Sequence, residues 1–136
     1  MDYSKLSDFE INQRVGDMAL NGRWACKPGS AGNETNNWQY GSGDPSLSLS
    51  SLPDYCNNPA DAWPIISANR ISIEYDSEDQ CDVPAEWVTA YGIDDLKVHV
   101  VAHQPCDKAL RSAMIVFLMM QELPNVPANS TGSDLR

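Results

Sequence analysis

The alternation of apolar and polar positions predicts an amphipathic helix close to the N-terminus. Three apolar residues recur at spacings of four and three: Ile11, Val15 and Met18. This spacing is the period of one helix face. Ser7 and Glu10 stand in the S-x-x-E arrangement of a capping box, which satisfies two backbone donors at a helix start. We therefore expect a helix over residues 8–20.

The middle of the chain has a pattern typical of two strands. Apolar residues alternate with polar ones over residues 70–75, and residues 97–102 are rich in β-branched side chains. Asp61 is expected to cap a short helix before the first strand. Residues 86–91, between the strands, are expected to form a short helical or irregular piece. The acidic residues near the end of the first strand, including Asp76 and Glu78, are expected in a solvated turn.

The C-terminal part of the pattern predicts a buried helix over residues 109–123, where nearly every side is apolar until Pro124. Residues 124–136 are polar and are expected to form a disordered tail. Residues 27–58 are interrupted by Gly, Pro and Ser and are expected to form a long irregular loop. The sequence thus predicts a single α+β domain over residues 1–123. Its small antiparallel sheet would pack against the N- and C-terminal helices in a sandwich-like arrangement.

The net charge of the chain and the placement of its basic residues limit the kinds of partner that it can bind. The chain has 136 residues, with 9 Lys and Arg against 19 Asp and Glu, which gives a net charge of −10. Because the basic residues are scattered, direct binding to nucleic acid is disfavoured, since it requires aligned cations. A basic protein partner is compatible with this charge. The longest apolar run, residues 113–120, is far shorter than the roughly 18 residues that span a bilayer, so no membrane segment is expected.

The four cysteines do not form a recognisable metal or redox motif. They are Cys26, Cys56, Cys81 and Cys106, and no two of them make a C-x-x-C pair. No secretory signal is apparent at the N-terminus, so we expect reduced thiols and a cytoplasmic protein. No metal ion and no cofactor is expected.

Candidate chemistry is sparse. His99, His103 and Cys106 are the one ligand-like cluster, but on a strand residues four apart lie about 13 Å apart, too far for one zinc ion. A bend in the chain would leave metal binding open. Cys106 at a helix start, with His103 before it, is the one conceivable catalytic pair. A packed cysteine and ordinary histidines are the simpler interpretation, and we expect a protein that is not an enzyme.

Aromatic residues in and after the long loop are the candidate binding residues: Trp38, Tyr40, Tyr55 and Trp63. Aromatic side chains give a large contact area at low entropic cost, so they could form a recognition surface. They could equally pin the loop onto the core.

Three stretches taken in order resemble a known family: residues 1–12 (MDYSKLSDFEIN), 56–66 (CNNPADAWPII) and 109–121 (ALRSAMIVFLMMQ). They resemble the NinX-like proteins encoded by tailed phages and prophages of enteric bacteria, over about residues 1–123. The layout is also similar to that of phage α-β-α sandwich domains. The resemblance implies a phage accessory protein in the cytoplasm of the infected cell. It carries over no catalytic residues.

Two hypotheses for function follow from the sequence. The first is a non-enzymatic acidic protein that binds and modulates a host or phage protein, for example a host nuclease or defence factor occupied by mimicry of DNA charge. The second is a small-molecule or nucleotide-binding module in which Trp38, Tyr40 and Trp63 stack on the ligand.

Overall fold

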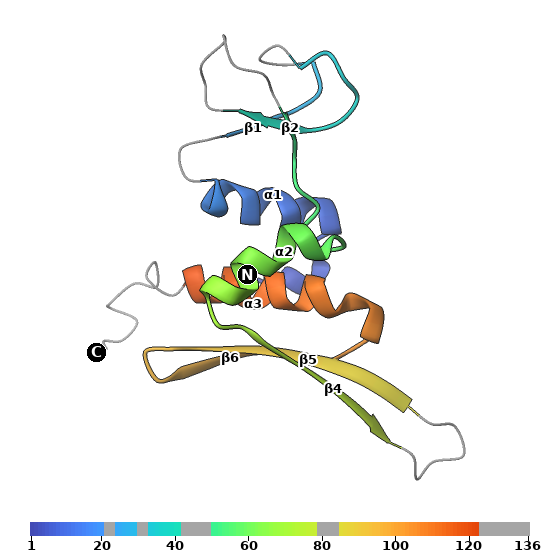
Figure 1. Cartoon of the computed structure of the whole chain (residues 1–136), viewed down its shortest axis with the longest axis vertical. Coiled ribbons are helices and arrows are strands. Elements are labelled where there is room, and N and C mark those ends of the chain that lie inside the picture. The colour runs from blue at the N-terminus through green and yellow to red at the C-terminus, as the bar shows by residue number, and fades with distance from the viewer. Residues whose placement is uncertain (21–23, 30–32, 42–49, 79–84, 123–136) are drawn as a thin grey trace.

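The computed structural model describes residues 1–20, 24–29, 33–41, 50–78 and 85–122 (Figure 1). Its helices are α1 (Asp8–Ala19), α2 (Pro59–Ala68) and α3 (Ala109–Glu122), and short 3-10 turns cover Tyr3–Lys5 and Cys106–Lys108. Its strands are β1 (Trp24–Cys26), β2 (Gln39–Gly41), β3 (Ser50–Ser51), β4 (Ser72–Glu78), β5 (Ala85–Asp94) and β6 (Lys97–Gln104). The α+β prediction is confirmed.

The strands form two antiparallel sheets of three strands each. The small sheet has the order β1-β2-β3, and the larger one has the order β4-β5-β6. Within the larger sheet, β5 is the central strand and β6 lies at an edge. The segment 27–58 is therefore not irregular throughout, since β2 and β3 lie inside it.

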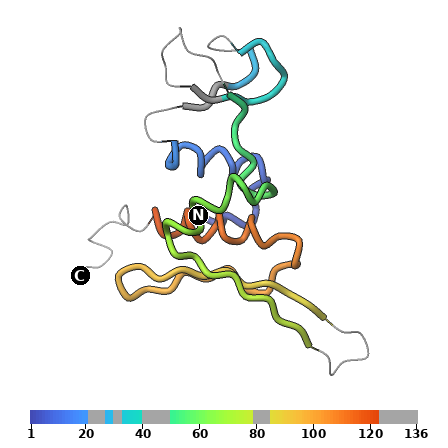
Figure 2. Tube along the Cα trace, viewed as in Figure 1, coloured from blue at the N-terminus to red at the C-terminus, as the bar shows by residue number. Residues whose placement is uncertain are grey.

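Helix α3 is the centre of the molecule. It runs along one face of the larger sheet, while α1 and α2 lie on its other side, and the small sheet lies beyond α1 (Figures 1 and 2). Met114, Val116 and Leu118 are at most 2% exposed, as expected for a helix that is covered on several sides. The N-terminal helix thus packs mainly on α3 and on β1, and the sheet is covered by the C-terminal helix.

The start of α1 follows the sequence signal closely. The Ser7 side chain accepts a hydrogen bond from the Glu10 N–H, and the Glu10 carboxylate accepts one from the Ser7 N–H. Ile11 and Val15 are fully buried. The predicted helix and its capping box are confirmed.

Helix α2 begins earlier than the sequence suggested. Asn58, not Asp61, is the N-cap, and its side chain accepts from the Ala60 N–H. Pro59 occupies the first helical position, where a missing N–H is tolerated. The Asp61 carboxylate instead accepts from the backbone N–H of Asp54, so it ties the preceding turn to the helix.

Strand β5 corrects the expectation of a short helical or irregular piece over residues 86–91. The three positions that face α3 are small or β-branched: Val88, Ala90 and Gly92 are all buried. A Cβ on Gly92 would lie 2.8 Å from Met120 Sδ and 3.2 Å from Val116 Cγ1, so the close approach of α3 leaves no room for a side chain at this position. Small residues at these positions weaken the strand signal in the sequence, although they are what allows the helix to pack.

Strand β4 extends further than expected. It continues to Glu78, so Asp76 and Glu78 belong to a paired strand and not to a turn. The predicted tail over residues 124–136 lies outside the described residues.

Candidate functional site

The face of the larger sheet that points away from α3, which we call the outer face, carries exposed apolar side chains. Successive side chains of a strand point to opposite sides of the sheet. Because Ala90 and Gly92 face α3, their neighbours Tyr91 and Ile93 point to the outer face. Two residues of β6 are their cross-strand partners on this face, Val100 opposite Tyr91 and Val98 opposite Ile93.

The exposure of these side chains is unusual for β-branched residues. Ile93 is 62% exposed, Val98 is 57% exposed and Val100 is 44% exposed. Single exposed apolar residues are common on proteins, but a contiguous group on a regular surface is typical of an interaction site. In the described part of the chain, α3 covers the opposite face, and no helix or strand covers this one (Figure 1).

The outer face also carries a row of carboxylates on its β4 side. Glu74, Asp76 and Glu78 occupy alternate positions of β4, opposite Thr89, Trp87 and Ala85 of β5. Alternate residues of a strand lie about 6.7 Å apart. The outer face thus consists of an acidic row along one edge strand and apolar side chains along the other two strands.

The turn between β5 and β6 presents a further apolar side chain. Asp95 and Leu96 form this two-residue turn with φ values of +46° and +69°. Two positive φ values are typical of a type I′ hairpin turn, for which Asn-Gly and Asp-Gly are the preferred sequences. Leu96 occupies the position that usually belongs to glycine, and its side chain is 99% exposed. The hairpin tip therefore holds a leucine in a conformation that is unfavourable for it.

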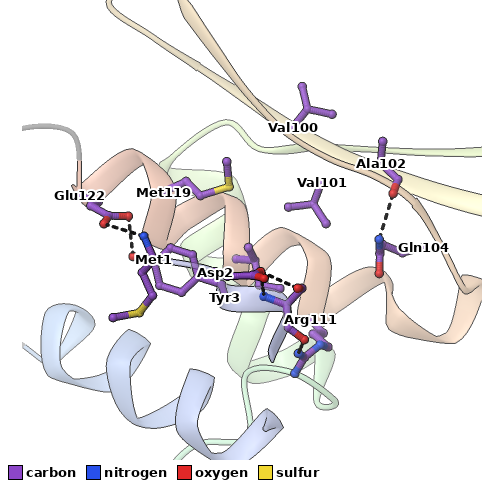
Figure 3. A pocket seen from close by; sticks show the side chains of 12 residues that line it. Met1, Asp2, Tyr3, Val100, Val101, Ala102, Gln104, Arg111, Met119 and Glu122 are labelled. Carbon is purple, nitrogen blue, oxygen red and sulfur yellow. Dashed lines mark hydrogen bonds and ion pairs between the residues drawn. The ribbon is translucent and has the colours of Figure 1, made fainter. Parts of the chain in front are cut away.

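A cavity of about 420 Å³ lies beside the outer edge of β6 (Figure 3). Three segments line it: residues 1–4 of the N-terminal segment, residues 100–102 and 104 of β6, and one side of α3. The contributing residues of α3 are Arg111, Ile115, Met119 and Glu122. We call this cavity the edge groove.

One end of the edge groove is built on Glu122. The Tyr3 hydroxyl donates a 2.8 Å hydrogen bond to Glu122 Oε2, and the amino group of Met1 lies 3.7 Å from Oε1. Burial and the neighbouring Glu122 carboxylate raise the pKa of Tyr3 to about 12. The phenol therefore remains a neutral donor that fixes the carboxylate at this end.

Arg111 holds the N-terminal segment against α3 near the other end of the edge groove. Its guanidinium donates to Asp8 Oδ1 at 2.7 Å, to the Leu6 carbonyl at 2.6 Å and to the Ser4 carbonyl at 3.3 Å. Partial burial acts to raise the pKa of Asp8. The hydrogen bonds from Arg111 and Asn57 outweigh this effect, so the pKa lies below its usual value. Arg111 is thus a structural cross-link whose charge is already neutralised.

Comparison with known proteins identifies the family. The family model described as bacteriophage P22, NinX matches residues 2–121 of the chain. The chain belongs to this NinX family. Comparisons with curated proteins and with solved structures gave no match. Family membership makes the chain a phage accessory protein, as the resemblance in the sequence implied.

The proposed aromatic residues whose side chains the structure describes are not gathered into one site in this NinX-family chain. Tyr55 is 4% exposed and belongs to the core, whereas Trp63 is 63% exposed on α2. Trp38 packs edge-on against Phe9 of α1, with ring centroids 5.2 Å apart. The backbone of Tyr40 belongs to β2, but its side chain lies outside the described residues. Trp38, Tyr55 and Trp63 do not line the edge groove.

The histidines and cysteines are also separated by the fold. His99 faces α3 beside Gly92, whereas His103 lies in an irregular stretch of β6 with φ +56° and packs edge-on against Trp87. Within the described ranges, no three His, Cys, Asp or Glu side chains come close enough to hold a metal ion. Burial, together with the nearby Asp8 carboxylate, raises the pKa of Cys56 to about 12, which disfavours its thiolate. None of the helices in the described ranges is long and apolar enough to cross a lipid bilayer.

Neither candidate surface could be recognised from the sequence alone. The residues of the edge groove come from three segments that are far apart in the chain, so no local motif marks them. The outer face had a partial signal, because β6 carries apolar residues at three consecutive positions, Val100, Val101 and Ala102, and not only at alternate ones. A strand in an antiparallel sheet with one solvated face normally alternates apolar and polar residues.

Proposed function

We propose that this NinX-family chain is a non-enzymatic binding protein that modulates a host or phage protein in the cytoplasm of the infected cell. The proposed contact surface is the outer face together with the hairpin tip. The observation that carries the proposal is Leu96, which is 99% exposed at a φ of +69°. The other observations extend this surface and define the chemistry of the partner.

Leu96 supports a binding role because the fold gains nothing from it. An almost fully exposed side chain makes no contribution to the core, and a left-handed conformation costs about 1–2 kcal/mol for a residue with a Cβ. Residues in sparsely populated backbone conformations cluster at functional sites. The free-energy cost of the left-handed conformation is offset if the leucine side chain enters an apolar pocket on another protein.

Ile93 and Val98 continue the apolar surface from the tip onto the sheet. They are direct cross-strand partners, so their side chains form one patch directly behind Leu96. Burial of one such side chain contributes about 1.5–3 kcal/mol. A few of them would form the central anchors of a protein–protein contact.

The acidic row on β4 defines the complementary chemistry of the partner. A protein with an apolar patch bordered by Lys and Arg would match Glu74 and Asp76, and the net charge of −10 would accelerate their encounter. DNA-processing enzymes carry such basic surfaces, so a host nuclease or defence factor is the partner class that we favour. In this account the carboxylates steer the partner, and the apolar side chains hold it.

Affinity purification with matched variants tests the proposal. The tagged chain is incubated with a lysate of infected cells, the captured protein is purified, and its dissociation constant is measured directly. The double variant Ile93→Thr/Val98→Thr keeps the β-branched shape and should weaken binding about 10-fold or more, since 1.4 kcal/mol equals a factor of ten. Met18→Thr on α1, which is 45% exposed, is the control and should bind like the wild type.

The charge contribution is tested separately. Glu74→Gln/Asp76→Asn should lower the association rate and reduce its dependence on salt, with a smaller effect on dissociation. If the outer-face variants retain wild-type affinity for every captured protein, this surface is not the binding site and the proposal fails.

The edge groove favours a second candidate function, a small-molecule or nucleotide-binding module. Its volume of about 420 Å³ falls within the range of ligand pockets, which is roughly 300–1,000 Å³. Such a ligand would contact Val101, Ile115 and Met119. Native mass spectrometry of the purified chain would reveal a stoichiometric bound metabolite if this function is correct.

A further inference from the structure

We propose that the edge groove binds an extended segment of a partner protein, which adds to β6 as a further strand and places a basic side chain at the Glu122 end. This inference rests on the proposed function, because it requires a protein partner. It gives the chain a second contact surface for that partner, and it specifies that the bound segment of the partner is extended.

The position of the groove along β6 points to strand addition. In the sheet order β4-β5-β6, the described part of β6 pairs on one side only. Val100, Val101 and Ala102 are consecutive, and consecutive side chains point to opposite faces, yet all three line the groove. The groove therefore follows the edge of the strand, where backbone groups can pair with a new strand.

The wall opposite β6 is a single face of α3. Arg111, Ile115, Met119 and Glu122 are spaced by four, four and three residues, which places them in one row along the helix. This row is about 16 Å long at 1.5 Å per residue. An extended segment of five residues has about the same length, so it would fill the groove from end to end.

Apolar residues of β6 and α3 face each other in the middle of the groove, and Glu122 and Arg111 lie at its two ends. Val101 projects from β6 toward α3, where Met119 lies on the facing wall (Figure 3). Ile115 of α3 also lines the groove. Alternate side chains of an added strand would contact this centre. At one end, Glu122 is 43% exposed, and at the other the Arg111 guanidinium is already held by Asp8, Leu6 and Ser4.

The charged residues that line the edge groove favour a segment that carries a lysine or arginine. The Asp2 carboxylate also lines the groove, and hydrogen bonds from the Ser4 side chain and backbone N–H lower its pKa. The Asp2 carboxylate is therefore negative at neutral pH. Among the described lining residues, the Arg111 guanidinium is paired with Asp8, and the Met1 amino group, 3.7 Å from Glu122 Oε1, is the remaining cation. The two carboxylates, Asp2 and Glu122, outnumber it. A lysine or arginine in the bound segment would be attracted to the Glu122 end.

Titration of the full-length, isotope-labelled chain with a short peptide tests this inference. The probe is acetyl-Lys-Thr-Val-Thr-Lys-amide, in which the valine and both lysines share one face and a lysine reaches the Glu122 end in either strand direction. Two control peptides replace both lysines with glutamate or methylate alternate backbone nitrogens. We expect amide shifts at residues 100–104 and along the facing side of α3. Both controls should bind at least about 10-fold more weakly, because the glutamate peptide loses the charge attraction and the methylated peptide loses the backbone hydrogen bonds of strand pairing.

A groove variant and a matched control complete the experiment. Glu122→Gln retains an acceptor for the Tyr3 hydroxyl, and it should weaken the lysine peptide about twofold to fivefold. Asp17→Asn, an equal charge change on the exposed side of α1, should leave its affinity unchanged.

Four results would overturn the inference. The first is absence of binding at millimolar peptide. The second is undiminished binding of the methylated peptide, and the third is concentration-dependent self-association that protects the β6 amides. The fourth is a metabolite bound in the groove. If the peptide fails while capture of the partner still depends on Ile93 and Val98, the proposed function stands and only the edge groove is misassigned.

Discussion

Replacing Leu96 with glycine should stabilise the fold, although the substitution removes an apolar side chain. Asp95 and Leu96 both have positive φ values in the turn between β5 and β6. Leu96→Gly converts this turn into Asp-Gly, one of the preferred sequences for the type I′ geometry. The residue is 99% exposed, so no burial is lost.

The expected magnitude follows from two opposing terms. Relief of the left-handed conformation contributes about 1–2 kcal/mol. The greater backbone freedom of glycine in the unfolded chain costs about 0.5–1 kcal/mol. The free energy of unfolding should therefore rise by about 0.5–1 kcal/mol, which for a chain of 136 residues raises the unfolding midpoint by about 2–5 °C.

Urea unfolding followed by tryptophan fluorescence measures this change, with Leu96→Ala as the control. Alanine also removes the leucine side chain but retains a Cβ, so the strain remains and stability should match the wild type within about 0.3 kcal/mol. The reasoning is refuted if the glycine variant is no more stable than the alanine variant.

The remaining predictions concern the interior and the N-terminal anchor. Arg111→Met should cost about 2–3 kcal/mol in urea unfolding at pH 7, because the Asp8 ion pair and the bonds to Leu6 and Ser4 are lost. Because the pKa of Asp8 is lowered in the folded state, ionised Asp8 stabilises the fold above about pH 4. The difference in unfolding free energy between wild type and Arg111→Met should therefore shrink as the pH falls through the folded pKa. An unchanged difference at pH 3 contradicts this. His99→Leu should raise the free energy of unfolding by about 1 kcal/mol in urea unfolding, because the buried Nε2 of His99 has no hydrogen-bond partner within the described ranges. Mass-spectrometric mapping at pH 8 should show Cys56 alkylated far more slowly in the native state than after unfolding, and equal rates would argue against its burial.

Helix α1 could be predicted because its signals are local. The capping box joins Ser7 to Glu10, and the buried face is marked by Ile11 and Val15, all within two turns. Helix α2 was placed less accurately, because Asn58 and Asp61 are both good caps. The choice between them depends on the contact of Asp61 with the Asp54 backbone, which belongs to the tertiary structure.

Strand β5 could not be predicted because two of the residues that face α3 are small, as the close packing of the helix requires. Ala90 and Gly92 have low intrinsic preference for strands, but they admit Val116 and Met120 of the helix. The outer face was hidden for a related reason. Val98 and Val100 have the residue types of a buried strand, and the sequence alone does not show that α3 covers the opposite face.

The measurement that tests the central claim most directly is partner binding by the Leu96→Gly variant alongside its unfolding free energy. If the hairpin tip exists for recognition, the variant should be more stable than the wild type and yet bind the captured partner about 10-fold or more weakly, as expected for the loss of one buried leucine. Wild-type affinity in the stabilised variant would contradict the account, because the strained leucine would then serve neither the fold nor the partner.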